Sequence, residues 1–314
     1  MYEKFLKKYA GFLFILPWVL GFIIFKLIPI VQALYFGFTD WNSLTAPTFI
    51  GFKNYIDLFH DNQFINALTV TAKFAIFSVP LGILVSLTLA VFLNNKIKGI
   101  SVFRTILYLP AVVSGVSIAL LWRWILDKNF GLINMVLAKI GISGPGWLSD
   151  PNWVLPSYLL IAVWGAGGGI LTYLAGLQDI PKTLYEAAEI DGAGWFEKFT
   201  KITVPMLSPI IFYNLVMGIV GAFRKFNDAY IIGGAGNQGK FYMIYLYENA
   251  FKYFKMGYAT AMAWILFLII LILTALVFKS SSIWVFYSGE VSSSKKRRFS
   301  KKLFKEGGRK NCKM

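Results

Sequence analysis

The chain carries, between two long apolar runs, the segment Thr183-Leu-Tyr-Glu-Ala-Ala-Glu-Ile-Asp-Gly-Ala-Gly-Trp-Phe-Glu-Lys-Phe-Thr-Lys-Ile-Thr-Val-Pro205-Met-Leu-Ser-Pro209. This segment is rich in charged side chains, is interrupted by two glycines and ends in two prolines. A polar helix that joins two membrane-spanning segments lies in water, where a soluble protein can bind it. The segment therefore indicates a membrane protein with an exposed docking loop.

The composition predicts a polytopic membrane protein. Of the 314 residues, 57% are hydrophobic and only 15% are charged, which is too apolar for an ordinary soluble domain. A hydrocarbon core about 30 Å thick needs roughly 20 helical residues, and the alternation expected of a barrel strand is absent. We therefore predict an all-α fold with six transmembrane helices, near Phe12–Leu34, Leu68–Leu93, Val102–Ile125, Val154–Leu177, Ile202–Ala222 and Tyr258–Phe278.

The net charge of +16 is concentrated at the C-terminus. This divides the chain into an N-terminal segment (1–10), a transmembrane domain (11–285, with the quoted loop at about 178–205) and a basic tail (286–314). A basic run directly after a span is typical of a cytoplasmic anchor on membrane lipid, so no nucleic-acid partner is expected. The cations of the tail are Lys295, Lys296, Arg297, Arg298, Lys301, Lys302, Lys305, Arg309, Lys310 and Lys313.

The distribution of lysine and arginine also predicts the orientation. With six spans, both termini, the turn between spans two and three and the loop around Glu186 share one side of the membrane. Most of the cations lie on that side, so we expect it to be cytoplasmic. The loop between spans five and six fits poorly, because it carries five cations yet falls outside.

The sequence offers little for bond chemistry. Cys312 is the only cysteine and His60 the only histidine, which excludes an intramolecular disulfide and a zinc site built from several imidazoles. The spans contain almost no carboxylates, so no catalytic, cofactor-binding or metal-binding residue is predicted. The first span is longer than a signal-peptide core and no small-x-small cleavage site follows it, so we expect it to be retained.

Within the quoted loop, Thr183 and Glu186 have the spacing of a capping box and predict the start of a helix. Gly192 has the position of a helix-ending residue with positive φ, after which Trp195–Lys201 forms a second short helix. An ordinary loop helix that only links two spans would look much the same. The first helix places on one face Leu184, Ala187, Ala188 and Asp191.

The outer loops are predicted to be long at Thr39–Ala67, which includes a short amphipathic interfacial helix, at Leu126–Trp153 and at Phe223–Gly257. The last of these contains Gly234–Lys240, which resembles a phosphate-binding loop. Such a loop needs a preceding strand and a Ser or Thr after its lysine, and here Phe241 follows. We interpret it as a flexible glycine-rich loop, a possible contact for a substrate-delivery protein.

Several polar and small residues inside the spans are candidates for a substrate pathway. Gly165-Ala-Gly-Gly-Gly169 either lets helices pack closely or unwinds the fourth span beside a cavity. The side chains of Trp164 and Tyr173 have the chemistry to stack on a sugar ring, and aromatic residues of this kind also face lipid or core. Asn214 either lines the pathway or bonds to a neighbouring helix.

Three cations lie within or near the spans, where charge is a hint of function. Lys73 and Arg123 are within reach of the outer interface and can extend toward it. Trp122 and Trp124 beside Arg123 predict an interfacial aromatic belt. Lys26 lies deeper, and its role stays open.

The quoted loop resembles the EAA loop of ABC importer permeases, and more narrowly that of the sugar permeases. In that family the loop is a coupling helix seated in a groove of the ATP-hydrolysing subunit. The resemblance thus implies that the docking residues are Glu186, Ala187, Ala188, Asp191 and Gly192. Further similarity, over about residues 10–285, rests on Asn54-Tyr55, Phe103-Arg104, Leu121–Trp124, Gly131–Asn134, Phe226-Asn227 and Gly257–Ala259.

The resemblance implies one subunit of a bacterial carbohydrate importer in the plasma membrane, with an oligosaccharide as cargo. Its partners would be a second homologous permease subunit, a pair of ATPase subunits and an extracytoplasmic sugar-binding protein. ATP and Mg would be bound by the ATPase, so this chain would hold no cofactor and be no enzyme. The alternatives are an ABC permease for a non-sugar solute and a stand-alone secondary transporter, which would place acidic residues at mid-membrane.

Overall fold

In a computed structural model, described over residues 14–95 and 99–286, the chain forms a helical bundle with one small antiparallel strand pair. The strands β1 (Thr39–Asp40) and β2 (Thr48–Phe49) have two residues each. The predicted all-α fold is confirmed. The predicted N-terminal segment 1–10, the cations Lys96 and Lys98, and the basic tail with Cys312 lie outside the described residues.

Four helices are long and apolar enough to cross a membrane: Phe14–Phe36, α4 (Asn62–Leu93), Trp195–Ile232 and α15 (Met256–Trp284). The first ends in α2 (Ile28–Phe36), and the third contains α12 (Val204–Phe223) and α13 (Asn227–Ile232). Two bent helix pairs also pass the length and composition test. The described chain thus has six spans, as predicted, when each bent pair counts as one.

Spans three and four, which the sequence predicts only as residue ranges, are each bent. α5 (Ile100–Val112) and α6 (Gly115–Ile125) meet at 92°, and α8 (Pro151–Trp164) and α9 (Gly167–Asp179) meet at 43°. At the first bend two consecutive residues are extended, with ψ of 143° at Val113 and 131° at Ser114. Helix geometry ends there because extended residues cannot continue the i to i−4 hydrogen bonds.

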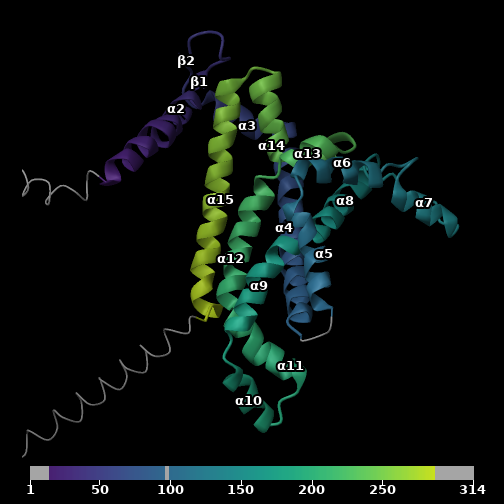
Figure 1. The fold of residues 1–314 in the computed structure, drawn as a ribbon. Helices are drawn as coiled ribbons and strands as arrows, with labels where there is room; N and C mark the ends of the chain where they lie inside the picture. The colour runs from purple at the N-terminus through teal and green to yellow at the C-terminus, as the bar shows by residue number, and fades with distance from the viewer. Residues whose placement is uncertain (1–13, 96–98, 287–314) are drawn as a thin grey trace, which may run out of the picture.

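The two ends of the bundle carry different structures (Figure 1). One end holds the strand pair, α3 (Lys53–His60) and α14 (Tyr242–Tyr247). The opposite end holds α10 (Lys182–Ile190) and α11 (Trp195–Lys198). The predicted amphipathic helix of the first outer segment is α3, which buries Asn54 and Leu58. The remaining outer elements are α7 (Leu132–Lys139), a 3-10 turn (Gly236–Gly239) and a π-turn (Glu248–Lys252).

Two further π-turns each precede a proline. Ile23–Leu27 leads to Pro29, and Phe199–Thr203 leads to Pro205. A proline lacks an N–H and clashes with the carbonyl four residues before it, so a wider turn relieves the contact without ending the helix. The predicted second short helix, Trp195–Lys201, does begin at Trp195, but it does not end at Lys201, because the helix continues through the π-turn into the fifth span.

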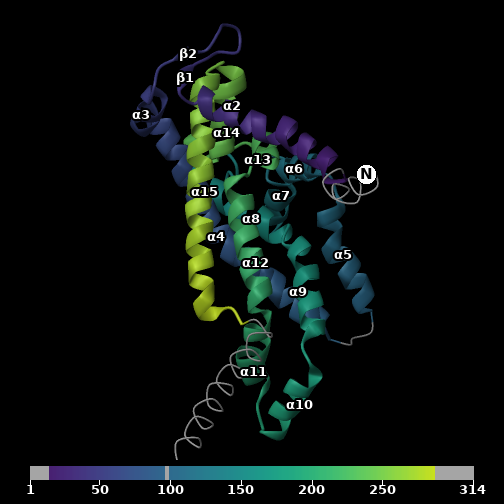
Figure 2. The same cartoon turned by 90° about the vertical axis from the view of Figure 1, so that its left-hand side faces the viewer.

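The helix Phe14–Phe36 points away from the bundle in Figure 1 and crosses in front of its upper part in Figure 2, and its apolar stretch has no buried residue. Lys26 lies exposed in its π-turn. The aromatic belt predicted around Arg123 is only half correct. Trp124 is exposed, but Trp122 is buried and packs edge-on against Trp164, because it faces the bundle.

The apolar core has two separate parts along the bundle axis. One cluster, at the end with α3 and α14, includes Val79, Ile161 and Ala222. The other, toward α10, includes Leu87, Ile170, Tyr173, Leu174 and Leu207. Between these clusters α4, α8, α9 and α12 carry mostly small residues, and small side chains leave space that large ones would fill.

Candidate functional site

The exposed helix α10 begins directly after Pro181, and no side chain caps its first turn. The capping box predicted from Thr183 and Glu186 is therefore wrong, because Thr183 already lies inside the helix. The predicted C-terminal signal is confirmed. Gly192 has φ +76°, its N–H donates to Glu189 O at 3.0 Å, and Ala193 N–H donates to Ala188 O at 2.9 Å. These two bonds form a Schellman motif, which favours glycine in the left-handed position.

Four of the predicted docking residues, Glu186, Ala187, Asp191 and Gly192, are exposed, whereas Ala188 is half-buried on the helix face that carries Tyr185. Their assignment as docking residues rests on the resemblance. Beside them lie large apolar side chains for which no motif in the sequence predicts a role. Exposed side chains of this kind in a water-facing loop indicate a protein interface, and here they are Leu184, Ile190, Trp195 and Phe196.

The helices α10 and α11 are fixed to each other and to the fifth span. Lys198 Nζ forms an ion pair with Glu189 at 2.8 Å, and the rings of Trp195 and Phe199 stack at 5.4 Å. The hydroxyl of Tyr185 lies 2.9 Å from that of Thr203, where the fifth span begins. These contacts connect α10 to the long helix that contains α12.

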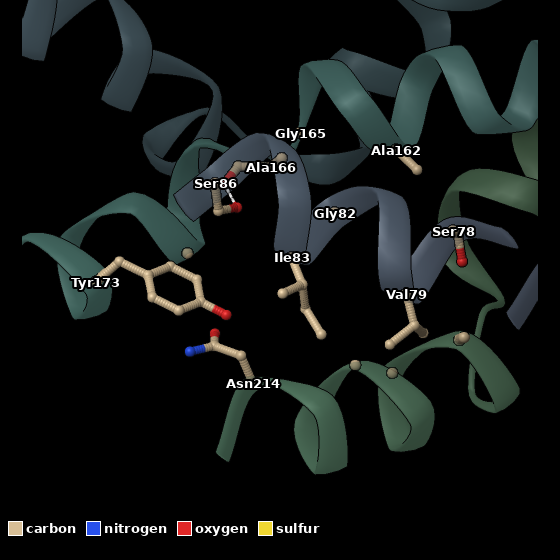
Figure 3. A pocket seen from close by; sticks show the side chains of 14 residues that line it. Ser78, Val79, Gly82, Ile83, Ser86, Ala162, Gly165, Ala166, Tyr173 and Asn214 are labelled. Carbon is tan, nitrogen blue, oxygen red and sulfur yellow. Dashed lines mark hydrogen bonds between the residues drawn. The ribbon is translucent and has the colours of Figure 1, made fainter. Parts of the chain in front are cut away.

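A cavity of about 420 Å³ lies in the gap between the two core clusters. Residues of α4, α8, α9 and α12 line it (Figure 3). None of its described lining residues is charged. The polar lining groups are Ser78, Ser86, Tyr173 and Asn214.

Two of the three predicted pathway residues, Tyr173 and Asn214, meet across this cavity from different helices (Figure 3). Asn214 Nδ2 donates to Ile210 O at 2.9 Å and to Thr172 Oγ1 at 3.3 Å. The hydroxyl of Tyr173 is buried and has no hydrogen-bond partner among the described residues. A buried polar group without a partner is costly, which is typical of a site that another molecule completes.

The glycine run at 165–169 both interrupts the fourth span and lets neighbouring helices pack closely, the two alternatives that the sequence left open. The helix breaks between α8 and α9, and Ser86 Oγ donates to the carbonyl of Ala166 in the break at 2.8 Å. A Cβ on Gly167 would lie 2.1 Å from Leu107 O, so this glycine allows α5 to approach. A Cβ on Gly169 would lie 2.8 Å from Ser86 Oγ. The run therefore bends the span beside the cavity and packs helices closely.

The third predicted pathway residue, Trp164, lines a neighbouring cavity of about 370 Å³. The two cavities share Ala162 and Gly165. The second one also contains Lys225 and Asp228, which form an ion pair. Lys225 Nζ further lies 4.8 Å from the ring centroid of Phe74, a cation–π contact. The charged side chains of Lys225 and Asp228 thus lie toward the end of the bundle that carries α13.

Beyond it, at the end with α3 and α14, Asp61 accepts hydrogen bonds from the hydroxyls of Tyr245 at 2.5 Å and Tyr258 at 2.7 Å. Burial opposes ionisation of Asp61, but these bonds and the N–H of Gln63 outweigh it, so the pKa of its carboxyl lies below the usual value. Burial, together with this carboxylate, raises the pKa of Tyr245 to about 12. The cluster ties the start of α4 to the last outer loop.

The glycine-rich segment Gly234–Lys240 does not form a phosphate-binding loop in the structure. It follows α13 and contains a 3-10 turn, and no strand precedes it among the described residues of this loop. Lys240 is instead paired with Glu248 at 3.0 Å. The dismissal of a nucleotide site here agrees with this geometry.

Residues 78–281 match the family described as binding-protein-dependent transport system inner membrane component. The chain belongs to this family. It is thus a multi-pass permease component of the plasma membrane, and the matched range includes the cavity, α10 and α15. A family of membrane transport components agrees with a fold of apolar helices around a gap.

Individual relatives span nearly the whole chain. YesP of Bacillus subtilis (strain 168), named a probable ABC transporter permease protein, is 42% identical and covers 90% of this chain and 93% of its own length. The arabinooligosaccharides transport system permease AraP of the same organism is 36% identical, covering 88% and 89%.

A solved bacterial ABC transporter that imports the acidic polysaccharide alginate has a chain with a TM-score of 0.79 and 26% identity. The match covers 89% of this chain and 98% of that one.

Proposed function

We propose that this chain is one transmembrane subunit of an ATP-driven importer that carries a sugar, an oligosaccharide, into the cell. The observation that carries the proposal is the connection between α10 and the cavity. The helix α10 directly follows α9 and is bonded to the start of the fifth span, and α9 and the α12 part of that span both line the 420 Å³ cavity. A displacement of α10 therefore changes the cavity.

The chemistry of the cavity supports an uncharged polyol as cargo. Hydroxyl and amide groups of Ser78, Ser86, Tyr173 and Asn214 can exchange hydrogen bonds with sugar hydroxyls. The exposed part of Trp164 offers a flat apolar surface for the C–H face of a sugar ring. The names of relatives that transport arabinooligosaccharides, trehalose or maltose, and lactose support the same class.

The energy would come from a partner. Two ATPase subunits, which bind ATP and Mg, would dock on Glu186, Ala187, Ala188, Asp191 and Gly192 and on the equivalent loop of a second, homologous permease subunit. Nucleotide binding would favour one arrangement of the coupling loops over another, and the cavity would open to the other side of the membrane. This polypeptide would then hydrolyse nothing itself and hold no cofactor.

An extracytoplasmic sugar-binding protein would deliver the cargo at the end of the bundle that carries α3 and α14, and both chain termini would be cytoplasmic. A solved relative is described in complex with an alginate pentasaccharide-bound periplasmic protein, which supports this arrangement. The outer cluster around Asp61 would then hold α4 and the last outer loop in register beneath that protein.

The proposal is tested with Glu186→Lys, which reverses an exposed charge of α10, and with Lys139→Glu as a matched control on α7. We expect Glu186→Lys to insert normally into the membrane, to lose sugar uptake and to retain less ATPase subunit through purification in mild detergent. Normal uptake in this variant, or co-purification of the wild-type chain with neither an ATPase nor a second permease, would overturn the proposal.

A further inference from the structure

Beside the cavity, and sharing Val79 with it, the bundle has an apolar groove of about 350 Å³ between α4, α12 and α15. The small side chains of Ala72 and Ala75 form its floor on α4, and Phe223 and Leu273 form parts of its walls. Pro80 also lines it and removes one backbone hydrogen bond from α4. Every described lining residue is apolar.

Two cations stand at one end of this groove. Lys73 lies three residues before Ile76 on the same face of α4, and Arg224 directly follows Phe223 at the end of α12. Both are exposed, and neither side chain has an ion-pair or hydrogen-bond partner within residues 14–95 and 99–286. The contact of Lys225 with the ring of Phe74 at 4.8 Å shows that the two helices are level at this point.

The position along the helices places the groove in one leaflet. From Lys73 to the end of α4 at Leu93 is about 30 Å at 1.5 Å per residue, which equals the thickness of the hydrocarbon core. Lys73 thus lies at one interface, and the groove from Ala72 to Pro80 extends about 12 Å below it. That is most of the depth of one leaflet, on the side of α3 and α14.

We infer that this groove binds a membrane phospholipid, with an acyl chain between α4, α12 and α15 and its phosphate on Lys73 and Arg224. An acyl chain matches the wholly apolar lining, and a phosphate matches the paired cations beside it. A helix of another protein would cover the apolar groove but leave the two charges without a partner.

The test uses the full chain, assembled with its co-purifying partners, in nanodiscs of phosphatidylethanolamine and phosphatidylglycerol. A phospholipid with a photoreactive diazirine on its acyl chain is cross-linked, and the labelled peptides are identified by mass spectrometry. We expect the label to concentrate on peptides that contain Ile76, Ile219 and Leu273. Ala72→Phe, which fills the groove, should reduce it to the level of other lipid-facing peptides, whereas Leu84→Phe, exposed on the same helix outside the groove, should not.

The double variant Lys73→Gln/Arg224→Gln tests the phosphate contact without altering the apolar lining, and it should also lose the label. Lys139→Gln, which removes an exposed charge on α7, is the control and should keep it. A uniform distribution of label over all exposed apolar faces would overturn the inference. So would label that persists in Ala72→Phe, or cross-links showing that a partner protein fills the groove.

Discussion

At the scale of single residues, Gly192 shows how one backbone conformation sets the path of a loop. Its φ of +76° ends α10 and directs the chain toward α11, and no other atom lies near enough to exclude a side chain. A substitution therefore acts through conformation alone. A β-branched residue in this region costs roughly 1–2 kcal/mol, whereas asparagine tolerates it.

We expect Gly192→Val to lose most sugar uptake and Gly192→Asn to keep it, with equal amounts of both variants in the membrane. Uptake of labelled oligosaccharide by intact cells measures this. Equal uptake in the two variants would show that the left-handed turn is not needed for coupling.

A second prediction at this scale concerns the contribution of Asp61 to stability. Because its pKa is lowered in the folded state, the carboxylate stabilises the fold above its unfolded pKa of about 4. That contribution is lost as the pH falls through the folded pKa.

We expect Asp61→Asn to lower the melting temperature of the detergent-solubilised protein at pH 7, by an amount that corresponds to about 1 kcal/mol. The difference from wild type should shrink as the pH falls below about 4. A difference that is constant down to pH 3 would contradict a role for the charge in the bonds from Tyr245 and Tyr258.

Some residues of the site could be read from sequence and others could not. The position and left-handed conformation of Gly192 follow from local rules, so they were predicted correctly. That Tyr173 and Asn214 meet across one cavity depends on the packing of α9 against α12, which one sequence does not encode in any local pattern. The apparent capping box failed because Pro181 begins the helix two residues earlier.

At the scale of elements, hydropathy predicts which segments enter the membrane but not where they break. All six apolar runs lie in the expected helices, since burial in lipid depends on composition over about 20 residues. The 92° bend at Val113 and Ser114 and the π-turns before Pro29 and Pro205 depend on individual backbone angles. Hydropathy averaged over about 20 residues does not depend on these angles, so it cannot locate the bends.

The bond between Tyr185 and Thr203 gives a prediction about the α10–α11 unit. Tyr185→Phe removes this hydroxyl contact, worth about 1 kcal/mol, and leaves the exposed face of α10 unchanged. We expect normal binding of the ATPase subunits but more ATP hydrolysed per sugar transported, because α10 moves less firmly with the fifth span.

The measurement is the ratio of ATP hydrolysis to uptake in proteoliposomes. Lys201→Gln serves as the control, since its pair with Glu197 is solvent-exposed and contributes little. An unchanged ratio in Tyr185→Phe would indicate that the ion pair between Lys198 and Glu189 suffices for the connection.

At the scale of the whole molecule, the orientation in the membrane can be tested with the cysteine content of the chain. Cys312 is the only cysteine, so Cys312→Ser gives a cysteine-free background. In that background we expect Lys53→Cys on α3 to react with a membrane-impermeant maleimide in intact cells, and Glu186→Cys on α10 to react only after the cells are opened.

Both positions are exposed in the folded chain, so burial within this chain does not explain a failure to react, and purified chain without partners gives the reference for Glu186→Cys. The native Cys312 should behave like Glu186→Cys, because the tail is predicted to be cytoplasmic. Labelling in the opposite order would reverse the orientation inferred from the distribution of lysine and arginine.

Val79 lines both the central cavity and the apolar groove behind it. The side chain of Val79 thus forms part of the wall between a partly polar cavity and a wholly apolar groove. A smaller residue in place of Val79 would do more than enlarge the cavity. It would also open the cavity toward the apolar groove, so that hydrocarbon could enter it. Gly218 lies against the same side chain, since a Cβ there would come within 2.9 Å of Val79 Cγ1, so these two residues together set how thick the wall between the two spaces is.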